Sequence, residues 1–291
     1  MTYRRIIQLS PTTKVVSLPS DWLSKNRLRK GDSVYVKELD NALIIEKIKP
    51  IAQHTSIDVS ELHDDILWSV IDAIYMQGYS DIELKVSVSQ RKLLVSIVKF
   101  FPLFIIAAEH KTTVELKAVA DTLDINFTNT LQRIRHITSN MVTEALAHIH
   151  RKDWDALNTI KKLDYTLNTY VSMCFRDLSS GKIKNSIALA QFVKILELYA
   201  DRLCLLFAAI AHSHTITKKD VRLIAQLSVV YDNAFKLVHK FSVSDINAQD
   251  TRRHALKAAS KKSPLHAHFT ELTQSLYDLQ EIIIQLHYTT L

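Results

Sequence analysis

Glycine is scarce in this chain, which has three glycines in 291 residues, whereas average usage would give about 20. Gly31, Gly78 and Gly181 stand far apart, so the sequence has no P-loop and no G-x-G-x-x-G phosphate cradle. This argues against nucleotide-binding folds that depend on glycine-rich loops. Hydrophobic residues make up 47% of the chain and charged residues 23%, which excludes a disordered chain and predicts two or three folded modules.

Cysteine and long apolar runs are scarce as well. Cys174 and Cys204 are far apart and form no C-x-x-C pair, which fits a reducing cytoplasm and argues against a cysteine zinc site. The longest apolar stretches, residues 98–108 and 203–211, fall short of the roughly 20 residues that cross a bilayer. Residues 1–10 lack the apolar core of a signal peptide. We therefore expect a soluble, cytoplasmic protein.

Positive charge is concentrated near the N-terminus. Residues 1–50 hold ten Lys or Arg and five Asp or Glu, a net charge of +5, whereas residues 51–120 hold six against nine, a net charge of −3. The remaining residues bring the total to +7. A dense basic segment suits an anionic partner, and a solvated basic surface explains the charge equally well.

Residues 3–49 alternate between apolar and polar positions with the period of a strand. The pattern predicts strands at residues 5–9, 14–18, 33–38 and 42–47, with a short helix at 21–26 capped by Ser20 and a turn at residues 29–32. Fifty residues arranged in this way have too little core to be stable alone. We therefore expect strands of a second copy to complete the fold in a homodimer.

The same segment resembles the SpoVT-AbrB swapped-hairpin family in four stretches: Val15–Pro19, Asp21–Leu23, Leu28–Asp32 and Leu43–Ile45. The resemblance implies a DNA-binding and dimerisation domain over residues 1–50, with basic residues facing the phosphates. By position, the leading candidates are Arg4, Arg5 and Lys14. A basic helix end also stabilises the helix dipole, so four others are weaker candidates: Lys25, Arg27, Arg29 and Lys30.

Residues 51–120 mix the two periods and predict a small α+β connector. We expect helices at residues 60–76 and 89–100 and strands at 81–87, 103–107 and 113–117. The first helix should end at Gly78 and turn six apolar side chains inward: Leu62, Ile66, Leu67, Val70, Ile71 and Ile74.

Residues 121–291 follow the 3.6-residue period of helices almost throughout. Six helices are expected, at residues 122–150, 153–179, 183–212, 217–241, 246–261 and 264–288. Long helices joined by short loops predict antiparallel bundles, here two groups of three. The predicted fold class is therefore multidomain and mainly α, with a small β domain at the N-terminus.

Two acids, Glu197 and Asp201, stand four residues apart on one face of an apolar helix. Burying two neighbouring carboxylates is costly without a cation, so a divalent metal would stabilise them. The more ordinary alternatives are ion pairs with Lys194, Arg202 or a base of a neighbouring helix, or simple exposure to solvent.

Residues 128–291 resemble the PhoU family of phosphate-uptake regulators, which have two three-helix bundles and often carry metal clusters on paired acids. The stretch Leu163–Tyr170, followed by Phe175-Arg176, matches one motif, and Leu196–Arg202 matches the next. The resemblance implies one possible site for a divalent metal or iron, formed by Asp164, Glu197 and Asp201 with Asn168 replacing the second acid of the family. Such a site has lost one negative charge, so we expect weak or absent metal binding.

The order of the modules resembles archaeal phosphate-uptake regulators that join a SpoVT-AbrB domain to a PhoU-like region. The leading hypothesis is therefore a homodimeric, DNA-binding regulator linked to phosphate uptake or signalling. The alternative is an adaptor that contacts a phosphate transporter ATPase or a signalling kinase, with the hairpin domain serving dimerisation. We expect no enzyme, because no nucleophile or general base accompanies the acids.

Overall fold

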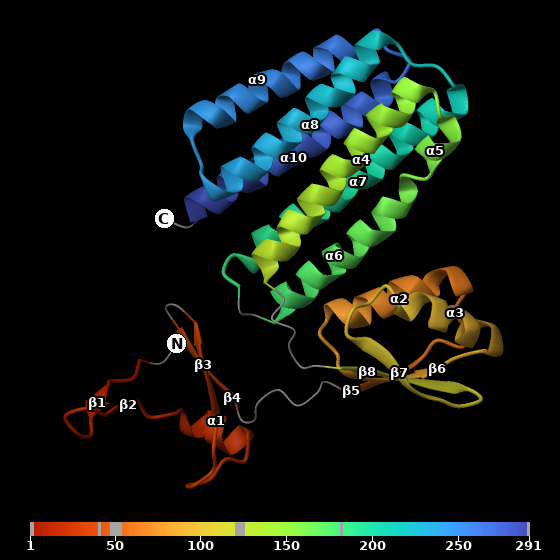
Figure 1. The fold of residues 1–291 in the computed structure, drawn as a ribbon. Helices are drawn as coiled ribbons and strands as arrows, with labels where there is room; N and C mark the ends of the chain where they lie inside the picture. The colour runs from red at the N-terminus through yellow and green to blue at the C-terminus, as the bar shows by residue number, and fades with distance from the viewer. Residues whose placement is uncertain (1–2, 40–41, 47–53, 120–125, 181–182, 290–291) are drawn as a thin grey trace. The chain divides into compact units, whose positions relative to one another are not determined.

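The computed structural model describes residues 3–39, 42–46, 54–119, 126–180 and 183–289, and its elements are drawn in Figure 1. The chain divides into two compact units, Met1–Ile51 and Ala52–Leu291. The expected fold class, multidomain and mainly α with a small β region at the N-terminus, is confirmed. Across the described ranges, no helix is both long and apolar enough to cross a membrane.

The N-terminal unit consists of two antiparallel hairpins and a short helix. Its elements are β1 (Ile7–Gln8), β2 (Lys14–Val15), α1 (Ser20–Lys25), β3 (Tyr35–Leu39) and β4 (Ala42–Glu46). Ser20 is the first helical residue and not the cap, because Pro19 occupies that position without a side-chain hydrogen bond. The expected turn is present: the backbone N–H of Arg29 donates to the Asp32 carboxylate at 2.7 Å, and Gly31 has a φ of +97°.

Over its described side chains, the N-terminal unit has no buried core in a single copy. None of its residues with described side chains is buried. Instead, large apolar side chains are exposed on both hairpins: Tyr3, Ile6, Ile7, Leu9, Val15, Val16, Tyr35, Val36 and Leu43. Such a surface is stable in water only when something covers it.

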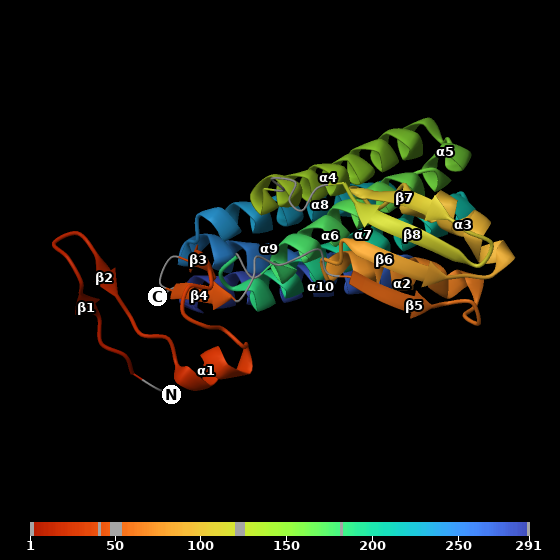
Figure 2. The same cartoon turned by 90° about the horizontal axis from the view of Figure 1, so that it is seen from below.

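The connector is a four-stranded sheet with two helices on one face (Figure 2). Its elements are β5 (His54–Asp58), α2 (Asp64–Met76), β6 (Asp81–Lys85), α3 (Val88–Val98), β7 (Phe104–Glu109) and β8 (Thr113–Ala118). The strand order is β5-β6-β8-β7, with β5 parallel to β6 and the other pairs antiparallel. The sequence did not predict β5, because its residues, His-Thr-Ser-Ile-Asp, are mostly polar.

The expected inward face of the first connector helix is partly wrong. Leu67, Ile71 and Ile74 are buried, whereas Leu62 and Ile66 are 39% and 44% exposed. The helix begins only at Asp64, so Leu62 lies in the preceding turn. The buried residues join the apolar faces of the strands in one core that includes Tyr75, Phe101 and Leu116.

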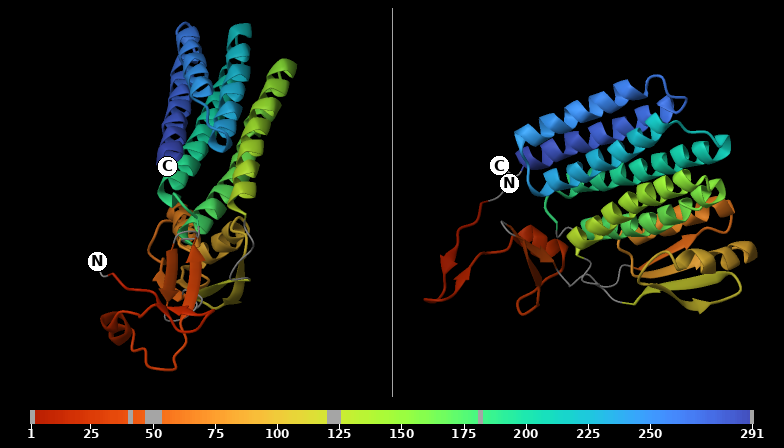
Figure 3. Two further views of the ribbon diagram at one scale, coloured as in Figure 1. Left: turned by 90° about the vertical axis from the view of Figure 1, so that its left-hand side faces the viewer. Right: turned by 45° about the horizontal axis from the view of Figure 1, so that its top comes forward.

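In the described residues from 126 onward, seven helices form the C-terminal part of the second unit (Figure 3). They are α4 (Phe127–Arg151), α5 (Trp154–Asn158), α6 (Lys161–Ser179), α7 (Ser186–Ser213), α8 (Lys218–His239), α9 (Val243–Ser260) and α10 (His266–Thr289). The helix expected at residues 153–179 is in fact two, α5 and α6. Asp153 caps α5 by accepting from the N–H of Ala156, and α5 ends after one turn.

The long helices pack in two groups of three, α4 with α6 and α7, and α8 with α9 and α10. The groups also pack on each other through α7 with α10 and α4 with α8, so their buried side chains form one continuous core. Its aromatic centre is a stack of Tyr199 and Tyr231, with ring centroids 4.8 Å apart. The long, regular apolar faces of the sequence produce this core directly.

Candidate functional site

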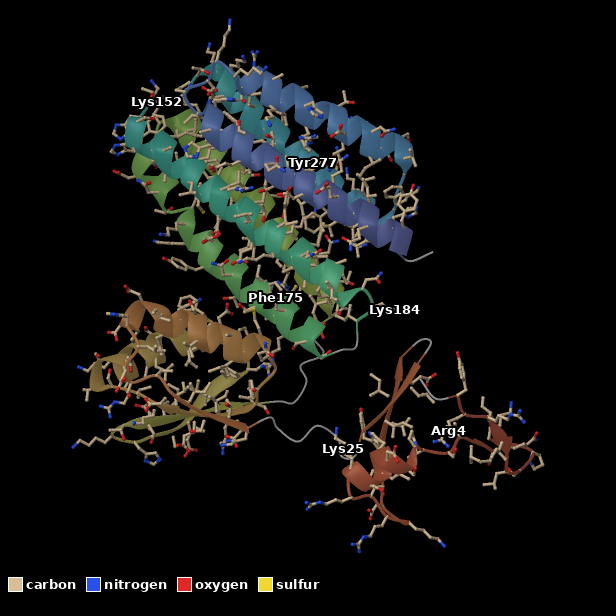
Figure 4. All side chains as sticks on the ribbon, turned by 180° about the vertical axis from the view of Figure 1, so that it is seen from behind. Arg4, Lys25, Lys152, Phe175, Lys184 and Tyr277 are labelled. Carbon is tan, nitrogen blue, oxygen red and sulfur yellow. The ribbon has the colours of Figure 1, made fainter. Side chains whose placement is uncertain are left out.

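The three leading basic candidates lie on or beside the first hairpin of the N-terminal unit. Lys14 begins β2, and Arg4 and Arg5 precede β1. All three side chains are exposed, and the Arg4 guanidinium donates to the Ser17 hydroxyl at 3.5 Å. This contact brings Arg4, labelled in Figure 4, to the segment that follows β2.

The four weaker candidates follow one another at the end of α1 and in the turn after it. Lys25 occupies the last turn of α1, where a cation stabilises the negative end of the helix dipole. Arg27 has a φ of +55°, and Arg29 and Lys30 belong to the turn that Asp32 closes. All seven candidates are exposed, and none forms an ion pair with a described residue. Their charge is therefore available to an anionic partner.

The acids of the helical region lie near one another on α6 and α7. Asp164 is buried, with 7% of its surface exposed, and its Oδ1 has no hydrogen-bond partner among the described residues. Burial, followed by the nearby charges of Asp201 and Glu197, raises the pKa of Asp164 to about 6. Burial and then Glu197 also raise the pKa of Asp201. The negative charges of neighbouring acids therefore disfavour the ionisation of Asp164 and of Asp201.

One of the ordinary alternatives to a metal is present at Glu197, whose Oε2 lies 2.7 Å from the Nζ of Lys194. The Arg202 guanidinium instead donates to the backbone oxygen of Glu271, at 2.9 Å, and to the Ser275 hydroxyl, and no ion pair joins it to these acids among the described residues. The Oδ1 of Asn168 is buried, and no residue that the structure describes forms a hydrogen bond with it. Among the residues that the structure describes, no three His, Cys, Asp or Glu side chains are grouped closely enough to hold a metal ion. The metal site therefore stays a prediction.

The second group of helices contains an ion pair between a buried arginine and an aspartate of the same helix, α9. The Arg253 guanidinium is held by Asp250, with Nη2 and Oδ1 2.7 Å apart, and lies 4.8 Å from the ring centroid of Tyr277, labelled in Figure 4. Arg253 is thus a buried base whose charge is paired within α9.

The connector is joined to the helical region through α2 and α6. The Arg176 guanidinium of α6 donates to the backbone oxygens of Tyr75, at 2.7 Å, and Tyr79, at 3.2 Å, and its Cζ lies 4.9 Å from the Tyr75 ring centroid. Four residues earlier, the Ser172 hydroxyl donates to the Asp72 carboxylate at 2.5 Å. Arg176 thereby occupies the carbonyl end of α2, which carries the negative pole of the helix dipole.

A cleft of about 550 Å³ lies beside this joint. Trp68 and Met76 of α2 line it together with Phe175 of α6, labelled in Figure 4, and Glu197 of α7. Burial raises the pKa of Asp72, whose carboxylate also faces this cleft. Sequence reasoning could not find the joint, because its hydrogen bonds connect residues about 100 positions apart.

One comparison with known proteins gives a match. Residues 12–53 match the family described as antidote-toxin recognition MazE, bacterial antitoxin. Searches of curated proteins and of solved structures each gave no match.

The MazE-like segment, residues 12–53, contains β2, α1, β3 and β4. Five of the seven basic candidates lie in it, and Arg4 and Arg5 lie before it. The swapped-hairpin resemblance of the N-terminal segment is thus supported by an independent comparison. The helical region and the connector lie outside the match.

Proposed function

We propose that this chain is a homodimeric, DNA-binding regulator whose N-terminal units together contact the phosphates of duplex DNA. The observation that carries the proposal is the N-terminal unit itself, which joins a net charge of +5 over residues 1–50 to apolar side chains left exposed in one copy. A second copy would cover the exposed apolar surface, and the clustered cations would attract an anionic partner. The MazE-like segment supports this class of function.

The proposal also links this regulator to phosphate uptake or phosphate signalling. It is supported by the PhoU resemblance of residues 128–291, and by the two groups of three helices into which this region folds. In this proposal the helical region receives the phosphate signal and the N-terminal units act on DNA. The proposal assigns no catalytic activity to the chain.

The DNA part is tested by replacing Arg4, Arg5 and Lys14 together with Ala in the full chain. Phosphate contacts release counterions, so each lost contact should reduce the slope of log affinity against log salt by about 0.9. We expect weaker binding to every duplex and a flatter salt dependence, measured by fluorescence anisotropy at several salt concentrations.

A matched control removes three exposed lysines of the connector, Lys92, Lys111 and Lys117, and should leave the affinity and the slope almost unchanged. Unchanged binding in the Arg4, Arg5 and Lys14 variant would reject these residues as the DNA contact. In that case the adaptor alternative is favoured, and retention of a phosphate transporter ATPase or a signalling kinase by the immobilised protein would support it.

The phosphate part is tested by mapping bound DNA across the genome in cells grown with and without sufficient phosphate. Occupancy that changes with phosphate at transport genes is expected. Occupancy that does not change would leave a DNA-binding regulator with no phosphate link.

A further inference from the structure

A second cleft, of about 880 Å³, lies at the end of the helical region where α4 and α7 end and α8 begins. This volume lies in the range that accommodates a small organic ligand. Lys152, on this cleft, is labelled in Figure 4 at one end of the helices. The floor is apolar and is formed by side chains of α4 and α8 and of the segment between α7 and α8: Leu146, Ile149, Ile216, Val221 and Ala225.

The wall of this cleft carries only positive formal charge. Lys152, Lys218 and Arg222 line it, and no Asp or Glu among the described residues does. None of these three bases forms an ion pair with another residue in the described part of the chain. The acids nearest in sequence are Asp153, which caps α5, and Asp220, which accepts from Thr217, and neither lines the cleft.

Helix dipoles explain only part of this charge. Lys152 follows the C-terminus of α4, where a cation is favourable, but Lys218 lies in the first turn of α8, where a cation opposes the dipole, and Arg222 lies one turn further on, where the dipole has little effect. Two bases that the helix dipole does not favour, beside an apolar floor, indicate a role other than stabilising the helix.

The backbone of the cleft is also unusual. Lys152 and His214 have positive φ values, 58° and 53°, in the left-handed region that glycine occupies at the lowest cost. Both side chains line the cleft. His214 stacks on the indole of Trp154, with ring centroids 5.8 Å apart and planes 12° apart, which makes a flat aromatic wall next to the bases.

We propose that this cleft binds a nucleotide, with its phosphates on Lys152, Lys218 and Arg222 and its planar base on the apolar floor beside Trp154. The cations supply the charge-assisted contacts that phosphates prefer, and the flat apolar surface distinguishes a nucleotide from inorganic phosphate. Such a site uses side chains in place of the glycine-rich loop that the sequence lacks. It is independent of the proposed DNA contact, which involves another unit of the chain.

The test uses the full chain and methylanthraniloyl-ADP, a fluorescent nucleotide, with ADP, adenosine and inorganic phosphate as competitors. We expect binding that ADP displaces and that adenosine or phosphate alone displaces poorly. Lys218→Gln with Arg222→Gln should weaken binding by about tenfold or more, because two charge-assisted contacts are lost. Trp154→Leu, which keeps an apolar side chain at that position, should weaken it while circular dichroism shows an unchanged helix content.

The matched control is Lys236→Gln with Lys240→Gln at the other end of α8, which removes the same charge and should bind normally. Absence of nucleotide binding in the wild type, or equal loss in the control, would overturn the proposal. Displacement by inorganic phosphate as efficient as by ADP would also overturn it, because the base would then contribute nothing. Displacement by duplex DNA, with DNA affinity reduced in the Lys218 and Arg222 variant, would instead make the cleft part of a nucleic-acid surface.

Discussion

The two units of this chain differ in how their apolar side chains are kept from water. The second unit buries its apolar side chains in two clusters, one in the connector and one in the helices. The N-terminal unit, over its described side chains, buries none and exposes Ile7 at 56% and Leu43 at 61%. The second unit therefore has a core of its own, whereas the first requires a partner surface, which in our proposal is a second copy.

The largest effect is expected from substitutions of exposed apolar residues in the N-terminal unit. Ile7→Asp with Val15→Asp places two charges on paired residues of the β1–β2 hairpin. Because a charge cannot be buried without a partner, the full chain should become monomeric and lose nearly all DNA binding. Light scattering measures the mass, and Thr12→Asp, in the turn between the strands, should leave it unchanged.

The isolated segment of residues 1–51 gives a second test of whether the N-terminal unit requires a partner. If its core comes from two copies, it should be a dimer whose unfolding midpoint rises with concentration. A folded monomer at micromolar concentration would contradict the interleaved arrangement.

The next effect concerns the joint between α2 and α6. Arg176→Met should reduce the free energy of unfolding by about 2 to 4 kcal/mol, because the backbone oxygens of Tyr75 and Tyr79 lose a charged donor. Arg133→Met is a suitable control, since Arg133 of α4 lies 5.8 Å from the Tyr170 ring centroid and should cost about 1 kcal/mol or less. Urea unfolding measures both, and equal losses would show that the carbonyl contacts contribute little.

A smaller effect depends on pH and on Asp164. Its folded-state pKa of about 6 exceeds the ordinary 3.8, so the folded chain holds this proton more tightly than the unfolded chain. Stability must therefore fall as the pH rises from about 4 to 6, and the full cost is present above pH 6. Asp164→Asn should remove this cost and stabilise the protein by about 1 to 3 kcal/mol at pH 8 and by little at pH 4.

Urea titrations at the two pH values measure this difference. Asp65→Asn, at the exposed start of α2, should show no such gain, because that acid is favoured by the helix dipole. A gain at Asp164 that is independent of pH would contradict the titration and point to packing.

The smallest effect concerns metal content. Asn168 supplies a neutral oxygen, so the wild type should hold little or no metal, whereas Asn168→Asp should raise uptake and Glu197→Gln should lower it. Elemental analysis of the three purified proteins decides. Stoichiometric metal in the wild type would contradict the expected weak site, and its absence from all three would remove metal from the mechanism.

The helices were predictable from the sequence and the sheet was less so. An apolar face repeated over 20 residues is a strong local pattern, so α4, α7, α8 and α10 lie where they are expected. β5 has only five residues, mostly polar, and is stabilised by pairing with β6, 27 residues later. The break between α5 and α6, at Thr159 and Ile160, has neither Gly nor Pro, and α6 begins there without a side-chain cap.

The candidate sites differ in the same respect: some are specified by a local segment, and others depend on contacts between distant residues. The basic residues were identified from a local segment, and the structure leaves them exposed as a contact with an anion requires. The burial of Asp164 and the partners of Arg176 depend on how distant helices meet, which local periodicity does not specify. The same holds for the basic cleft, whose lining comes from residues 146 to 225.

The outer strand β7 has a consequence for the behaviour of the protein at high concentration. It lies at the edge of the sheet, its sequence Phe-Ile-Ile-Ala-Ala-Glu is apolar, and Ile105 is 49% exposed. An edge of this kind can recruit strands from other molecules and begin aggregation. The register shift between Ile106 and Ala108 interrupts the regular spacing of its backbone groups, and Glu109 places a charge at its end. The irregularity thus protects the connector from growing into an extended sheet.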